Sequence, residues 1–89
     1  MTWSIEYTDT ALRTLRKMDR QVARRLLDFM DEQIAAADNP RALGMPLRGS
    51  ALGDFWRYQV GDRRLICDLQ DSRLVVLVID AGHRRDIYE

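Results

Sequence analysis

Two strands joined by a tight turn can be recognised in residues 55–70, which read FWRYQV-GD-RRLICDLQ. Both flanks are rich in aromatic and other apolar residues, and Gly61-Asp62 is typical of a two-residue hairpin loop in which the glycine takes a positive φ. A hairpin closed in this way fixes which residues face each other. The expected pairs are Val60 with Arg63, Gln59 with Arg64, and Arg57 with Ile66.

This register places Arg57 and Arg64 on the same face of the sheet, as diagonal neighbours about 7–8 Å apart. The opposite face is apolar and is expected to receive helices. Its residues are Trp56, Tyr58, Leu65, Cys67, Leu69, Leu74, Val76 and Val78.

A third strand is predicted from Arg73 to Ala81, because this run is apolar and β-branched on both faces, as in a central strand. If Asp71-Ser72 is a two-residue loop, Arg64 lies beside Ile79. The segment after Gly82 then leaves the sheet just past Arg64. We therefore expect a phosphate-binding cluster at this end of the sheet, formed by Arg57, Arg64, His83, Arg84 and Arg85.

The first half of the chain predicts a strand and two helices. Residues 3–7 alternate apolar and polar side chains, as a half-buried strand does. Thr8 is placed to cap a helix with an apolar stripe through Met18, and Asp19 to cap a second helix that Asn39-Pro40 ends. Residues 41–54 form a loop with a short strand near Leu47. The expected fold is α+β, one domain over residues 1–89, with an N-terminal strand, a two-helix hairpin and a three-stranded antiparallel meander.

Composition narrows the classes of function. Fourteen basic and fourteen acidic residues cancel, which argues against a broadly basic nucleic-acid binder and leaves only a local patch for that purpose. A single cysteine excludes an internal disulfide, and no set of side chains has metal-ligand spacing, so neither a metal nor a cofactor is expected. The chain starts without an export signal, and its longest apolar run, 74–79, is too short for a membrane. We expect a cytoplasmic protein that does not contact membranes.

An ordered set of short motifs resembles the RelE/ParE superfamily of bacterial toxins, over almost the whole chain. The motifs are Leu47-Arg48-Gly49, Trp56-Arg57-Tyr58, residues 61–67 (GDRRLIC), residues 74–78 (LVVLV) and residues 82–88 (GHRRDIY). The resemblance implies the toxin of a type II toxin–antitoxin module, neutralised by a cognate antitoxin and meeting DNA only indirectly through that antitoxin.

RelE-type members cleave mRNA on the ribosome by metal-free attack of a ribose 2′-hydroxyl on the neighbouring phosphate. On that interpretation the family's catalytic positions fall on Arg57, Arg64, Arg84 and Tyr88, and its RNA-binding positions on Arg48, His83 and Arg85. The partners would be the antitoxin, the ribosome and mRNA.

Two alternatives remain open from the sequence. One is a ParE-like poison of DNA gyrase without nuclease activity, which the zero net charge permits. The other is a non-toxic module that only binds an antitoxin-like partner.

Overall fold

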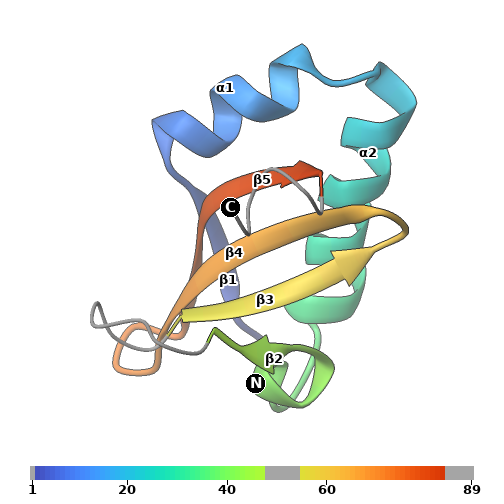
Figure 1. Cartoon of the computed structure of the whole chain (residues 1–89). Coiled ribbons are helices and arrows are strands. Elements are labelled where there is room, and N and C mark those ends of the chain that lie inside the picture. Colours follow the sequence, from blue (N-terminus) through green and yellow to red (C-terminus); the bar gives the residue numbers. More distant parts are fainter. Residues whose placement is uncertain (1, 48–54, 84–89) are drawn as a thin grey trace.

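In the part of the chain that the structure describes, five strands form a mixed sheet, and two helices cover one of its faces (Figure 1). The computed structural model describes residues 2–47 and 55–83. In chain order the strands are β1 (Ser4–Tyr7), β2 (Met45–Pro46), β3 (Phe55–Val60), β4 (Arg63–Gln70) and β5 (Val75–His83). Across the sheet their order is β1-β5-β4-β3-β2. The α+β class, the first strand and the antiparallel meander β3-β4-β5 confirm the prediction from sequence, and β1 adds a parallel partner for β5.

The helices α1 (Asp9–Lys17) and α2 (Arg20–Phe29) begin at the predicted caps. The Thr8 hydroxyl accepts a hydrogen bond from the Ala11 backbone N–H at 3.1 Å, and an Asp19 carboxylate oxygen accepts one from Gln21 N–H at 2.9 Å. Each cap satisfies an N–H that has no partner within its helix. Only Met18 and Asp19 lie between the two helices, and α2 runs in a different direction from α1 (Figure 1).

The core lies between these helices and the apolar face of the sheet. Ala11, Leu15, Leu26 and Met30 pack on the face predicted to receive them. From the sheet this core takes Tyr58, Leu65, Cys67, Leu69, Val76, Val78 and Ala81, all nearly inaccessible to solvent.

The β3–β4 hairpin has the predicted register. Val60 faces Arg63, Gln59 faces Arg64, and Gly61 takes a φ of 63°. The two-residue loop therefore sets which face each following side chain occupies, and Arg57 and Arg64 share the face away from the helices.

The β4–β5 connection corrects the prediction. Its loop has four residues, Asp71–Leu74, and β5 runs from Val75 to His83 instead of from Arg73 to Ala81. Leu74 takes a φ of 51°, which nothing in its residue type indicates. A register shift between Ile66 and Cys67 moves the pairing by one residue more, so Arg64 lies beside Gly82 and not beside Ile79. The longer loop thus displaces the pairing by two residues, and the register shift adds the third.

The second helix also ends differently from the prediction. Regular α-helix stops at Phe29 and continues as a π-helical turn, Met30–Ile34, before the chain turns away. Asn39-Pro40 starts a 3₁₀ helix, Pro40–Leu43, in which the Asn39 side chain accepts a hydrogen bond from Arg41 N–H at 3.3 Å. The short strand expected near Leu47 is β2, one residue earlier, and it pairs with β3.

Candidate functional site

A small hollow of about 320 Å³ opens on the side of the sheet where Arg57 and Arg64 lie. Its lining combines Arg57, Gln59 and Arg64 with residues 42–45, which come from the 3₁₀ helix and β2. The hairpin register predicted the first three side chains on one face. The sequence predicts only a loop for residues 42–45, which close the hollow in the structure.

Arg64 is the cation of the hollow that is withdrawn furthest from solvent. Its relative exposure is only 9%, although arginine is rarely buried. Arg64 pairs with Gly82 on β5, and because glycine has no side chain, the paired position on β5 places none beside Arg64. A guanidinium with so little water around it attracts an incoming anion more strongly than one on an open surface, because the local dielectric is lower.

Arg57 forms the more accessible side of the same hollow. Its backbone pairs with Met45 of β2 on one side and Ile66 of β4 on the other. Its Nη2 atom lies 3.5 Å from the Met45 sulfur. Two guanidinium groups on neighbouring strands thus face one space, an arrangement suited to the oxygens of a phosphate.

Gly44 allows the 3₁₀ helix and β2 to approach β3 this closely. A Cβ built at Gly44 would lie 2.7 Å from the Arg57 carbonyl oxygen and 2.7–2.8 Å from the Tyr58 ring. Real contacts of this kind are essentially never so short, so any side chain at residue 44 must displace one wall of the hollow.

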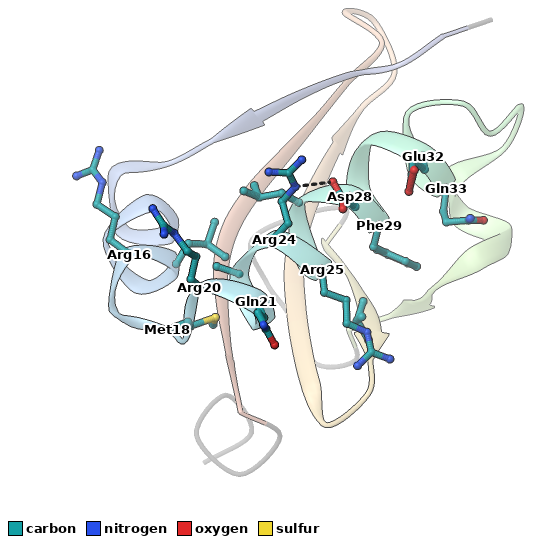
Figure 2. A pocket seen from close by; sticks show the side chains of 14 residues that line it. Arg16, Met18, Arg20, Gln21, Arg24, Arg25, Asp28, Phe29, Glu32 and Gln33 are labelled. Atoms are coloured by element: carbon teal, nitrogen blue, oxygen red, sulfur yellow. Dashed lines mark ion pairs between the residues drawn. The ribbon is translucent and has the colours of Figure 1, made fainter.

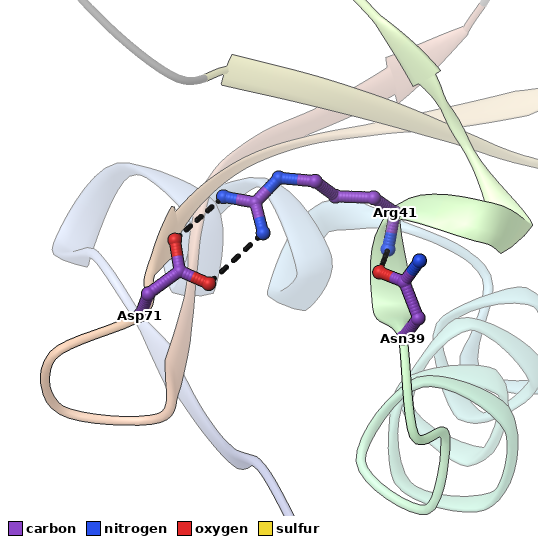
Figure 3. A network of polar contacts seen from close by, with 3 residues as sticks. All are labelled: Asn39, Arg41 and Asp71. Atoms are coloured by element: carbon purple, nitrogen blue, oxygen red, sulfur yellow. Dashed lines mark hydrogen bonds and ion pairs between the residues drawn. The ribbon is translucent and has the colours of Figure 1, made fainter.

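A polar clamp holds the 3₁₀ helix to the β4–β5 loop (Figure 3). Arg41 donates from Nη1 and Nη2 to the two carboxylate oxygens of Asp71, at 2.9 and 2.8 Å. These hydrogen bonds are the main reason that the pKa of Asp71 falls below its ordinary value. The Arg41 guanidinium also lies 5.9 Å from the Trp56 ring centre, and the buried Tyr58 hydroxyl donates to the Pro40 carbonyl at 2.9 Å. One wall of the hollow is therefore fixed at several points.

The other site residues predicted from sequence are placed only in part. His83 is the last described residue of β5 and pairs with Arg63, one residue from Arg64. Arg48, Arg84, Arg85 and Tyr88 lie outside the described residues. Among the described residues, those that line the hollow supply cations, one amide and apolar groups, and none is a carboxylate, histidine or tyrosine.

Within residues 2–47 and 55–83, no three His, Cys, Asp or Glu side chains gather as a metal site would require. In the same part of the chain, no helix is long and apolar enough to cross a membrane.

A larger groove of about 1330 Å³ runs over the other side of the molecule, along α1, α2 and the end of β3 (Figure 2). Half-buried apolar side chains form its floor, namely Met18, Ala23, Leu27, Phe29 and Val60, together with the buried Leu15. Arginines line it as well: Arg16, Arg20, Arg24 and Arg25. Asp28 and Glu32 add two acidic groups, and Arg24 pairs with Asp28 at 3.4 Å. The groove is apolar at its centre and more basic than acidic around it.

The fold, a mixed sheet with a helical pair on one face and two arginines on the other, is that of the small bacterial toxins that the sequence resembles. The family of ParE toxins of the type II toxin–antitoxin system parDE matches residues 5–88, so the chain belongs to it. It is a type II toxin of the RelE/ParE superfamily.

Individual relatives agree with this placement. Toxin RelG of Mycobacterium tuberculosis is 28% identical over 88 residues, which cover 99% of this chain and 98% of RelG. In the crystal structure of the toxin–antitoxin complex RelBE2 from M. tuberculosis, the matching chain has a TM-score of 0.83 at 24% identity, covering 94% of this chain and 93% of that one. A free-state mutant of Escherichia coli toxin RelE has a TM-score of 0.78 at 24% identity, covering 98% and 88%. At these identities the solved structures establish the fold.

Proposed function

We propose that this toxin is an endoribonuclease that cleaves ribosome-associated mRNA and so inhibits translation. The observation that carries the proposal is the convergence of Arg57 and the buried Arg64 in one hollow, beside the point where β5 leads into residues 84–89. RNA presents at each step a phosphate whose single negative charge is shared by two non-bridging oxygens, and paired guanidinium groups match that geometry.

In the proposed reaction the 2′-oxygen of a ribose attacks the adjacent phosphorus and the bond from phosphorus to the 5′-oxygen breaks. The products are a 2′,3′-cyclic phosphate and a 5′-hydroxyl. The 2′-hydroxyl gives up its proton, and the leaving 5′-oxygen takes one. The step needs no metal if cations neutralise the charge that develops on the phosphate.

Arg64 is the residue that we assign to this charge, with Arg57 beside it. By family position, Arg84 shares the phosphate and Tyr88 transfers a proton, while Arg48, His83 and Arg85 contact the RNA. These last assignments rest on the resemblance. An ordinary tyrosine, with a pKa near 10, is a weak base at neutral pH, so holding the RNA in line for attack would carry much of the catalysis.

The test compares two adjacent arginines on opposite faces of β4. Arg64→Ala should lower the cleavage rate about 10²–10³-fold, as removal of one preorganised donor does. Arg63→Ala, whose side chain does not line the hollow, should leave cleavage unchanged. Primer extension on a reporter mRNA after induction, with and without blocked translation, measures the cuts. Equal cleavage by the Arg64 variant and the parent, with both folded, contradicts the proposal.

The family match also carries a second candidate, a poison of DNA gyrase, because the matching family is that of ParE. It predicts growth arrest with intact mRNA and loss of DNA supercoiling by purified gyrase. A third candidate, a non-toxic binding module, predicts normal growth on induction without an antitoxin. The same induction experiment separates all three.

We further propose that a cognate antitoxin neutralises the chain by laying an acidic amphipathic segment in the groove along α1 and α2. The apolar floor offers the area that such a segment needs to bury, and the surrounding arginines attract its carboxylates. The relatives in the RelBE2 complex and in the intact E. coli RelBE complex are themselves toxins bound to antitoxins. Any contact with DNA would then pass through the antitoxin.

A further inference from the structure

Two exposed apolar side chains lie on the rim of the arginine hollow. Leu43 is 49% exposed and Met45 is 56% exposed, which makes them the most exposed large apolar residues in the described part of the chain. Single exposed apolar residues are common and need no explanation. These two flank Gly44 and both line the hollow that holds Arg57 and Arg64.

The rim is held in place rather than free to fold inward. The Met45 backbone pairs with Arg57, and its sulfur lies 3.5 Å from the Arg57 guanidinium. The preceding 3₁₀ helix is tied to the rest of the molecule by the bidentate Arg41–Asp71 pair (Figure 3). Leu43 and Met45 are therefore presented to solvent at a fixed distance from the cations, a preorganised apolar surface beside a charged one.

A nucleotide is similar in size to the hollow and also combines a charged part with an apolar part. Its phosphate is anionic, and its base is a flat aromatic ring whose faces are poorly hydrated. The hollow, at about 320 Å³, is at the small end of the range of ligand sites, which suits a single nucleotide. A thioether packs favourably against aromatic rings, and its flexibility lets it fit more than one base.

We propose that Leu43 and Met45 form a nucleobase-binding lip, against which one base of the RNA packs while its phosphate lies at Arg57 and Arg64. The lip then sets which nucleotide is preferred next to the cleaved bond. This inference rests on the proposed ribonuclease function and names how that site selects its substrate.

Cleavage by lip variants gives the first test. Met45→Ala and Leu43→Ala should each lower kcat/KM roughly 2- to 10-fold and flatten the sequence distribution of cut sites, read by sequencing RNA 5′ ends. Met45→Phe should restore the rate, because an aromatic ring also stacks on a base. The matched control is Leu12→Ala on α1, a half-buried leucine that lines neither the hollow nor the groove. Cut sites distributed alike in the parent and both lip variants overturn the inference while leaving the ribonuclease proposal intact.

A binding measurement tests the lip without any cleavage. In protein labelled with ¹³C at its methionine methyl groups, nucleoside monophosphates should shift the Met45 signal, and ribose 5-phosphate should not. Met18 and Met30 serve as internal references, since they lie on the helical side of the sheet. A Met45 shift of equal size with ribose 5-phosphate, or no shift with any nucleotide, overturns the lip. A base-dependent shift in a protein that cuts no RNA supports the lip and removes only the nuclease.

Discussion

At the level of single residues, Gly44 and Gly61 are needed for different reasons. Gly44 has no room for a side chain, because a Cβ there would lie 2.7 Å from the Arg57 carbonyl oxygen. Gly61 has room but takes a φ of 63°, which costs an L-residue free energy. In the sequence both are simply glycines in predicted turns or loops. Only the structure shows that Gly44 is required by lack of space and Gly61 by its backbone conformation.

Substitution by alanine should distinguish them. Gly44→Ala forces a new Cβ against the Arg57 carbonyl oxygen and the Tyr58 ring, and it should lower the free energy of unfolding by about 1–3 kcal/mol, like other overpacked sites. Gly61→Ala should cost about 1–2 kcal/mol through the left-handed backbone alone. Urea denaturation gives both values. RNA cleavage should fall further in the Gly44 variant, since its displacement reaches Arg57. Equal loss of cleavage in the two variants would argue against a role for residue 44 in shaping the hollow.

Tyr7 predicts a pH dependence of stability. Its hydroxyl is buried and has no hydrogen-bond partner in the described part of the chain, and burial, with a contribution from Asp31, raises its pKa to about 12. Because the folded pKa exceeds the ordinary value of 10, the neutral phenol favours the folded state. That stabilisation is complete below pH 10 and is lost as the pH rises toward 12.

Tyr7→Phe should therefore remove part of the alkaline loss of stability while changing stability little at pH 7. Chemical denaturation at pH 7 and pH 11 measures the difference. A parallel decline of both proteins between these pH values would show that another group is responsible.

At the level of elements, the clamp from the 3₁₀ helix to the β4–β5 loop should affect motion more than global stability. The Asp71 side chain is exposed, and exposed ion pairs contribute little to folding. Its pKa is lowered by Arg41, so the pair stabilises the fold above the ordinary carboxyl pKa near 3.8 and loses that contribution as the pH falls through the lowered value.

Asp71→Asn should leave the denaturation midpoint nearly unchanged but speed amide hydrogen exchange at Ala42 and Gly44, which donate to the Asn39 and Arg41 carbonyls. Asp62→Asn is the control, because Asp62 pairs with the adjacent Arg63 in a different loop. Unchanged exchange at both amides in the Asp71 variant would show that the clamp is not what orders this wall.

The elements also show where sequence patterns are sufficient. The β3–β4 hairpin was predicted with its register, because Gly61-Asp62 fixes loop length and loop length fixes facing pairs. The β4–β5 loop was not, because Leu74 adopts a positive φ that its side chain does not favour. The Arg41–Asp71 pair joins residues 30 apart in sequence and has no local signal. Hence the arginine face could be predicted, whereas the wall that closes the hollow required the structure.

For the whole molecule, a net charge of zero means that association depends on where charges gather. Around the groove, Arg20 and Arg24 are exposed and should guide an acidic partner to the helices. Arg20→Glu with Arg24→Glu should slow antitoxin association about tenfold at low salt, and added salt should shrink the difference. Arg13→Glu with Lys17→Glu, two exposed residues outside the groove, changes the net charge by the same amount and is the control. Stopped-flow or surface binding measures the rates, and an equal effect of this control variant would locate the antitoxin elsewhere.

The pairing of β1 with β5 has a consequence for when, during its synthesis, this toxin can fold. The first strand finds its neighbour at the far end of the chain, as in the hydrogen bond from Thr8 to Ile79 across 71 residues. Contacts this distant form slowly and only after the intervening chain exists. Until β5 has been synthesised, the nascent chain lacks the strand that lies between β1 and β4 in the sheet. The sheet therefore cannot close until its last strand in chain order has been synthesised, and we expect the toxin to have no folded site while β5 is still missing.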